Sequence, residues 1–137
     1  MLSRRRRKRT PATPPGGLTP LDAAVTPTAY GAVVTLAGEL DIATVPRVRE
    51  AIAAPAVAAA SAVLVDLTGV TFMDSTGLAV LLGLERDLSA RRGRLAVVCP
   101  EGPARLLLDV TGVAERLELH PTRAAAEDAL SSPRAAP

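Results

Sequence analysis

The sequence of 137 residues contains few aromatic residues, a single cysteine and a single histidine. One Tyr, one Phe and no Trp are too few for the base-stacking surfaces of RNA-recognition and oligonucleotide-binding folds. Cys99 has no second cysteine with which to form a disulfide, and the single His120 excludes zinc sites built from several histidines. We therefore expect no metal, no cofactor and no specific nucleic-acid ligand.

Long apolar runs are also missing from the sequence. No segment approaches the ~20 consecutive apolar residues of a membrane-spanning helix. The arginine run near the N-terminus is not followed by the apolar stretch of a secretory signal. These two absences predict a protein that has no membrane span and is cytoplasmic.

The net charge of +2 conceals a strong asymmetry between the N-terminus and the rest of the chain. Six of the 16 basic residues lie within Arg4–Arg9, and the other ten stand against 14 acidic residues, which leaves −4 on the remainder. The body of the protein is therefore mildly acidic. The basic run is either a solvated extension or a salt-sensitive attraction site for a polyanion such as nucleic acid or an anionic membrane.

Composition divides the chain into one domain and two tails. Hydrophobic residues make up 48% of the sequence, which is enough for a core in a chain of this length. Residues 1–20 combine the basic run with prolines and glycines and lack apolar periodicity, so we predict that they are disordered, like residues 131–137. The folded domain is expected over residues 21–130.

Within this domain, apolar strand patterns alternate with amphipathic helix patterns. Strands are expected over residues 21–25, 32–37, 62–67, 95–99 and 117–119, and helices over 43–54, 75–90, 103–110 and 122–130. Residues 68–73 and 54–60 are expected to form loops. The alternation predicts a single α/β domain with a mixed sheet of four or five strands and about four helices, in which the first strand pairs antiparallel with the second.

Several residues carry local signals for these elements. Thr44 is the expected cap of the first helix, and Pro46 suits its first turn. Gly93 lies just past the end of the second helix, where glycine often stops a helix. The almost wholly apolar segment Ala62–Leu67 is typical of a central strand that is buried on both faces.

The most informative segment is Asp74-Ser75-Thr76-Gly77, which lies between that strand and an apolar helix. Ser75 is expected at the N-terminus of the helix, just beyond the carboxyl end of a central strand, where open α/β sheets often bind ligands. Asp, Ser and Thr are also ordinary N-cap residues, worth about 1 kcal/mol each, so the local pattern leaves a purely structural role open.

The segment matches no hydrolase or nucleotidase motif. The nucleophile elbow G-x-S-x-G would need a glycine where Met73 stands, and the Asp-Thr-Gly of aspartic proteases is interrupted by Ser75. The P-loop motif needs a lysine, but the only one, Lys8, lies in the N-terminal tail. We therefore expect a protein that is not an enzyme, and a hydroxyl that accepts phosphate, which is favoured at a helix N-terminus.

Three motifs together resemble those of a known family. They are L-A-G-E-L-D at Leu36–Asp41, V-D-L-T-G-V-T-F-M-D-S-T-G-L at Val65–Leu78 and R-L-L-L-D-V-T-G at Arg105–Gly112. In their order and spacing, they resemble a STAS domain, specifically that of a small anti-sigma factor antagonist. The resemblance implies a sheet with helices mainly on one side, and a role in transcription regulation during stress response or sporulation.

The resemblance also implies a switch. The unphosphorylated antagonist would bind an anti-sigma factor of the histidine-kinase-like ATPase fold and free a sigma factor. Phosphorylation of Ser75 by that partner would break the complex, and a phosphatase would restore the hydroxyl. Asp74 would orient the acceptor, Gly77 would let the first helical turn approach the partner closely, and Asp41 would lie near the phosphorylated site. Thr76 is a cap or a second acceptor.

Two other interpretations come from the same family resemblance. A STAS subunit of a transporter or lipid-transfer assembly would bind an ATPase without being phosphorylated. A scaffold in a stress-signalling complex would need a larger N-terminal domain.

Overall fold

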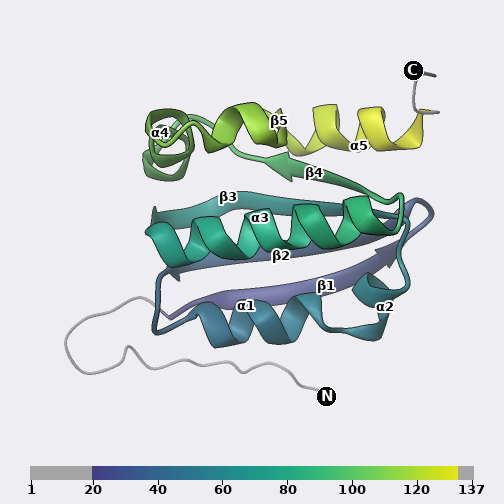
Figure 1. The fold of residues 1–137 in the computed structure, drawn as a ribbon, viewed down its shortest axis with the longest axis horizontal. Coiled ribbons are helices and arrows are strands. Elements are labelled where there is room, and N and C mark those ends of the chain that lie inside the picture. Colours follow the sequence, from purple (N-terminus) through teal and green to yellow (C-terminus); the bar gives the residue numbers. More distant parts are fainter. Residues whose placement is uncertain (1–19, 133–137) are drawn as a thin grey trace, which may run out of the picture.

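The computed structural model describes residues 20–132, which contain a single five-stranded sheet with the strand order β1-β2-β3-β4-β5 (Figure 1). The strands are β1 (Asp22–Thr28), β2 (Gly31–Leu40), β3 (Ala62–Met73), β4 (Arg94–Val98) and β5 (Glu118–His120). β1 is antiparallel to β2, and the other neighbouring strands are parallel. The predicted mixed sheet with an antiparallel first strand is therefore confirmed, whereas the predicted tails lie almost entirely outside the described residues.

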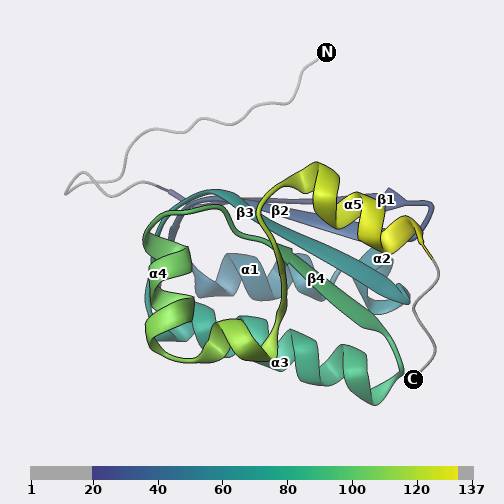
Figure 2. The ribbon, with the colours of Figure 1, turned by 90° about the horizontal axis from the view of Figure 1, so that it is seen from above.

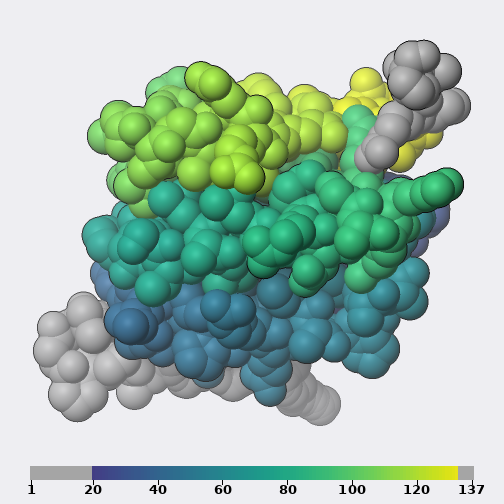
Figure 3. All heavy atoms as spheres, in the orientation of Figure 1, coloured from purple at the N-terminus to yellow at the C-terminus, as the bar shows by residue number. Residues whose placement is uncertain are grey.

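Helices cover the two faces of the sheet unequally (Figures 1 and 2). The helices are α1 (Val45–Ile52), α2 (Pro55–Ala58), α3 (Ser75–Ala90), α4 (Pro103–Val110) and α5 (Arg123–Ser131), with a 3-10 helix, η3 (Val113–Arg116). The helices α1 to α4 lie on one face, here called the helix face, and α5 lies on the other. Figure 3 shows the helix face as adjacent bands formed by α1 with α2, by α3, and by α4 with the following chain. The prediction of helices mainly on one side is confirmed.

Alternation along the central strands separates two cores. Val63 and Val65 of β3 belong to the larger core beneath α1 to α4, whereas Leu64 between them belongs to a smaller core beneath α5. Because successive strand side chains point to opposite faces, a sheet covered on both sides needs the nearly continuous apolar run that was noted in Ala62–Leu67. Every residue of Val63–Leu67 is buried, which confirms β3 as the central strand.

The prediction that residues 68–73 form a loop is wrong, because β3 continues to Met73. The second half of the strand pairs with β2 up to the pair Leu40 and Met73, across two register shifts at each of which β3 has one residue more than β2. Gly69 lies within the strand and does not end it. The absence of a side chain there allows β3 to lie close to Ala37 of β2, since a Cβ atom at position 69 would lie 2.8 Å from the Ala37 side chain.

Three details of the helices differ from the prediction. The segment 54–60, expected as a loop, contains the short helix α2, which begins at Pro55, so the domain has five α-helices instead of about four. The first helix covers Val45–Ile52 instead of the predicted range 43–54, with Pro46 in its first turn as predicted. The left-handed residue that ends α3 is Arg92, with a φ of 61°, and not Gly93. Gly93 is needed for packing instead, since a Cβ atom there would lie 2.9 Å from Cδ2 of Leu88.

Candidate functional site

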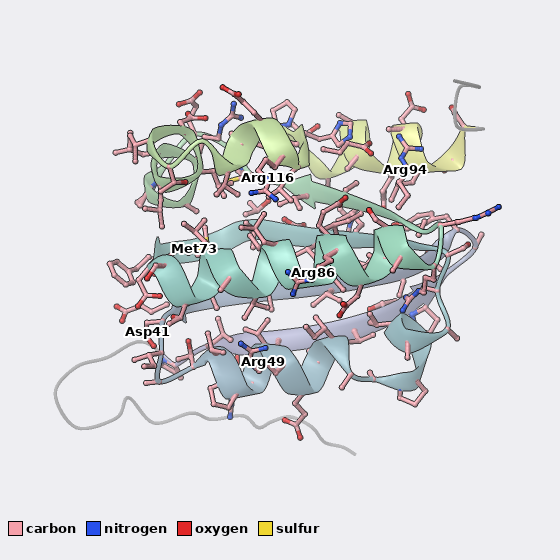
Figure 4. All side chains as sticks on the ribbon, viewed as in Figure 1. Asp41, Arg49, Met73, Arg86, Arg94 and Arg116 are labelled. Atoms are coloured by element: carbon pink, nitrogen blue, oxygen red, sulfur yellow. The ribbon has the colours of Figure 1, made fainter. Side chains whose placement is uncertain are left out.

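The predicted site residues lie at the edge of the sheet where β2 and β3 end. The main-chain N–H of Asp74 donates to the carbonyl oxygen of Leu40 over 3.2 Å, so the two strand ends and the start of α3 are joined. Figure 4 shows Asp41 and Met73 at this end of the molecule and Arg94 at the opposite end. The topology therefore brings Asp41 of one loop to the same edge as the segment 74–77.

Asp74 is the N-cap of α3. Its Oδ1 accepts a hydrogen bond from the main-chain N–H of Thr76 at 2.9 Å and a second one from the Thr76 hydroxyl. The bond from this hydroxyl is the main reason that the pKa of Asp74 is lowered; burial opposes it, and main-chain N–H groups, including that of Ile42, lower the pKa further. The carboxylate therefore stays ionised at neutral pH and helps to hold the loop after β2 against the start of α3.

Ser75 and Thr76 differ in the state of their hydroxyl groups. Ser75 is the first residue of α3 and is exposed, and its hydroxyl makes no hydrogen bond with any described residue. Thr76 is half-buried, and its hydroxyl donates to the Asp74 carboxylate. Of these two adjacent hydroxyls, only that of Ser75 is both accessible and unengaged.

Gly77 is buried in the first turn of α3. A Cβ atom at this position would lie 2.8 Å from Cγ of Leu40 and 2.8 Å from Cγ of Met73. The glycine thus allows the helix to pack closely on the ends of β2 and β3. The structure gives Gly77 a packing role inside the domain. The contact of Gly77 with a partner stays a prediction.

Asp41 organises the loop between β2 and α1. Its Oδ1 accepts hydrogen bonds from the main-chain N–H groups of Ala43 at 3.0 Å and Thr44 at 3.1 Å. The Thr44 hydroxyl accepts from the Asp41 N–H at 3.0 Å and lies 2.7 Å from the Glu39 carbonyl oxygen, to which it donates. Thr44 is the N-cap residue of α1, as predicted, but its side chain makes no capping hydrogen bond because its hydroxyl is used within the preceding loop.

Two exposed apolar side chains were missed by the sequence analysis. Ile42 is 75% exposed in the loop after β2, and Phe72 is 46% exposed near the end of β3. The sequence analysis missed Phe72 because it assigned residues 68–73 to a loop, whereas β3 continues to Met73. Leu106 and Val110 add further exposed apolar surface on α4.

Neither a cluster of metal-ligating side chains nor a membrane-spanning helix is found among the described residues. Within residues 20–132, no three His, Cys, Asp or Glu side chains are grouped so that they could hold a metal ion. In the same range, no helix is long and apolar enough to span a bilayer. The edge around Ser75 combines the Asp74 carboxylate with the exposed apolar side chains of Ile42 and Phe72.

Comparison with known proteins agrees with this architecture. The STAS domain family model matches residues 21–126. The anti-sigma-B factor antagonist of Listeria monocytogenes is 34% identical over 86 residues, which cover 63% of this chain and 75% of the relative. The crystal structure of an anti-sigma factor antagonist from Mycobacterium paratuberculosis is similar with a TM-score of 0.75 and 28% identity, covering 82% of this chain and 95% of that one.

The anti-sigma factor antagonist SpoIIAA has been solved in two forms, and both resemble this chain. The unphosphorylated form has a TM-score of 0.67 and 26% identity, covering 80% of this chain and 96% of its own. The phosphorylated Bacillus form has a TM-score of 0.61 and 27% identity, covering 80% of this chain and 99% of its own. The chain described here therefore belongs to the STAS domain family, among the small anti-sigma factor antagonists.

Proposed function

We propose that this chain is an anti-sigma factor antagonist that is switched by phosphorylation of Ser75. In its unphosphorylated form it binds an anti-sigma factor through the edge of the sheet around Ser75, and a sigma factor is released. The anti-sigma factor is a kinase of the histidine-kinase-like ATPase fold that transfers phosphate from ATP to the Ser75 hydroxyl, and a phosphatase hydrolyses the phosphoserine. Its relatives are named for antagonism, which is a binding activity and not an enzymatic reaction.

The observation that carries this proposal is the contrast between two adjacent hydroxyls. The Ser75 hydroxyl is exposed and makes no hydrogen bond with the described residues, so a kinase can reach it. The Thr76 hydroxyl is bound to Asp74, so phosphorylation there would break an internal hydrogen bond. This difference favours Ser75 as the acceptor and assigns Thr76 to the cap.

The charges around Ser75 explain how phosphate would end the complex. A phosphoserine adds about −1.5 to −2 charges next to Asp74, which is ionised at neutral pH because its pKa is lowered. The N–H of Thr76, the next helical donor after that of Ser75 itself, is already engaged by Asp74 and does not neutralise the phosphate. A partner surface that covers Ser75 would have to desolvate this dianion beside a carboxylate, which weakens binding.

The neutral state offers a surface suited to a protein partner. Ile42 and Phe72 supply exposed apolar side chains at the same edge as Ser75. Apolar side chains that become buried at the centre of an interface, with polar groups at the rim, supply most of the affinity in many complexes. Since the Ser75 side chain makes no contact that supports the fold, its phosphorylation would change this surface and leave the domain intact.

The test uses Ser75→Ala as bait to isolate the anti-sigma factor from native cell extract, followed by ATP-dependent phosphate incorporation with the isolated partner. Intact mass and peptide mapping should place one phosphate on Ser75. Ser75→Ala should bind without being released by ATP. Ser75→Asp should bind more weakly by about 1–3 kcal/mol, the usual size of a switch coupling.

Thr76→Ala is the matched control, and its phosphate incorporation should remain close to that of the native chain. Phosphate on Thr76 alone would move the acceptor by one residue and contradict the assignment of the two hydroxyls. No incorporation, together with equal partner affinity of Ser75→Ala and Ser75→Asp, would support the transporter-type STAS subunit instead.

A further inference from the structure

Part of the sheet face on which α5 lies is left uncovered by the described elements. Among these elements only α5 lies on that face, and its small core contains Val33 and Leu64 from the first halves of β2 and β3 (Figure 2). Toward the carboxyl ends of these strands, the side chains on the same face as α5 are exposed or half-buried. We call this region the open sheet face, and it consists of Asp22 and Ala24 of β1, Ala37 and Glu39 of β2, and Thr68 and Phe72 of β3.

The open sheet face combines carboxylates with an aromatic ring. Glu39 and Phe72 are direct partners in the pairing of β2 with β3, so their side chains are neighbours on one face. Asp22 stands opposite Ala37 in the pairing of β1 with β2. Neither Asp22 nor Glu39 makes an ion pair with another residue of the described range 20–132.

This combination suits a guanidinium group better than any other protein side chain. Arginine binds carboxylates through two parallel N–H donors and also stacks on aromatic faces, while lysine offers only a compact charge. Ala37, which lies opposite Asp22 and two residues before Glu39, is small and leaves room for an extended chain to lie across the strands. The expected ligand is therefore an arginine-rich peptide segment.

The chain itself carries such a segment, and the part of the chain that contains it joins the domain directly before Asp22, the first residue of β1. Arg4–Arg9 contains five arginines and one lysine. The carbonyl oxygen of Pro20 lies so close to Gly38 that a Cβ atom there would be 2.3 Å away, and the Leu21 carbonyl accepts a 2.6 Å hydrogen bond from Arg47. The 11 residue-to-residue steps from position 9 to position 20 can span at most about 40 Å, whereas β1 to β3 extend over about 10 Å across the sheet.

We propose that Arg4–Arg9 docks on the open sheet face of its own chain, with guanidinium groups on Asp22, Glu39 and Phe72. The contact is electrostatic and therefore weakens with salt. Since Phe72 precedes Ser75 by three residues, the docked segment lies beside the phosphorylation site. If the proposed function holds, the segment then competes with the anti-sigma factor for this edge.

The experiment places a nitroxide label on Thr10→Cys of the full chain and measures paramagnetic broadening of main-chain amide resonances. Cys99 does not take up the label because it is buried and burial raises its pKa. The amides of Ala37 and Phe72 should broaden strongly at low salt, while those of Leu82 and Arg86 in α3 on the helix face should not. The experiment measures docking in the absence of an anti-sigma factor. A negative result would therefore contradict the docking proposal without contradicting the proposed function.

The matched control replaces all six basic residues of Arg4–Arg9 with Gln, which keeps the length of the tether. Broadening at Ala37 and Phe72 should fall to the level of the helix face, and high salt should have the same effect on the native segment. The double variant Glu39→Gln with Phe72→Leu should also lose it. Equal broadening in the native and Gln-substituted chains would overturn the proposal. If, in addition, only the native chain is retained on heparin, the basic segment binds an external polyanion instead of the open sheet face.

Discussion

At the scale of single residues, Gly77 links the candidate site to the core. The absence of a side chain lets the first turn of α3 rest on Leu40 and Met73 at the ends of two strands. Because these neighbours are buried at 1% and 5% exposure, they have little room to move away from an added methyl group. The position of Ser75 relative to the sheet edge therefore depends on this glycine.

Gly77→Ala should destabilise the domain by about 1–3 kcal/mol, the usual cost of overpacking a core. Urea denaturation of the native chain and the variant measures the difference. Gly83→Ala in the same helix is the matched control, because a Cβ atom there would meet only the Arg86 guanidinium at 3.8 Å. It should stabilise the domain by about 0.5–1 kcal/mol, as expected for glycine replaced by alanine within a helix. A loss of stability from both substitutions would contradict the packing argument.

Asp74 gives the site a pH dependence whose direction follows from its pKa. The pKa of the folded state lies below the ordinary value of about 3.9, chiefly because of the hydrogen bond from the Thr76 hydroxyl. The unfolded chain therefore binds the proton more readily, so the contribution of Asp74 to stability is complete above about pH 4. It is lost as the pH falls through the pKa of the folded state.

We expect Asp74→Asn to be less stable than the native chain at pH 7, while the two become similar well below pH 4. Asn is itself a good N-cap residue, so the substitution keeps the capping geometry and removes the charge. Urea denaturation at a series of pH values between 7 and 2.5 provides the comparison. A difference that stays constant across this range would show that the carboxylate charge is not what stabilises the cap.

At the scale of single elements, α3 ends in a conformation that its sequence does not favour. Arg92 has a φ of 61°, and the following N–H of Gly93 donates to the Leu88 carbonyl over 2.6 Å. This is the hydrogen-bond arrangement in which a left-handed residue closes a helix, usually a glycine. A side chain at such a position costs about 1 kcal/mol or more relative to glycine.

Arg92→Gly should therefore stabilise the domain by about 1 kcal/mol, measured as a rise in the urea midpoint at an unchanged slope. Arg92→Ala is the control, because alanine keeps the Cβ atom that causes the strain. Its stability should stay within about 0.5 kcal/mol of the native chain, as expected for a surface substitution. An equal gain from both variants would mean that the arginine side chain, and not the backbone, is unfavourable.

At the scale of the whole molecule, Arg94 at the start of β4 connects the sheet to α5, the helix on the face opposite the helix face. Its guanidinium forms two 2.8 Å hydrogen bonds with the Glu118 carboxylate on β5, and its Nη1 donates to the Ala129 carbonyl of α5 over 3.1 Å. Burial alone would raise the pKa of Glu118, but the hydrogen bonds from Arg94 and His120 lower it overall. One side chain thus connects β4, β5 and α5.

Arg94→Met should lower the stability of the domain by about 1–2 kcal/mol, since charged hydrogen bonds are lost while most of the packing is kept. Amide hydrogen exchange should accelerate most in β5 and α5 and least in β3. Arg86→Met, at an arginine without an ion pair within residues 20–132, should change stability by less than about 0.5 kcal/mol. Uniform acceleration over all elements would contradict the local role of Arg94.

The sequence by itself determined the order of the elements and the nature of the site. Periodicity of apolar residues predicted the five strands and four of the helices, because an amphipathic helix and a strand buried on both faces have different patterns. The segment Asp74–Gly77 marked the start of α3, because its residue types favour helix caps. The three motifs led to the family to which the chain belongs, and they placed the candidate phosphate acceptor at Ser75.

Tertiary structure decided what no local pattern contains. Whether Gly69 ended a strand or filled a close contact depended on Ala37, more than 30 positions away in the chain. Of the two adjacent hydroxyls, only that of Thr76 forms a hydrogen bond. As the N-cap, Asp74 accepts from both the N–H and the hydroxyl of Thr76, whereas the Ser75 side chain is exposed. The exposure of Phe72 beside Glu39 arises from the pairing of two strands and from the limited reach of α5. Contacts between distant segments govern such features, and a sequence window cannot contain them.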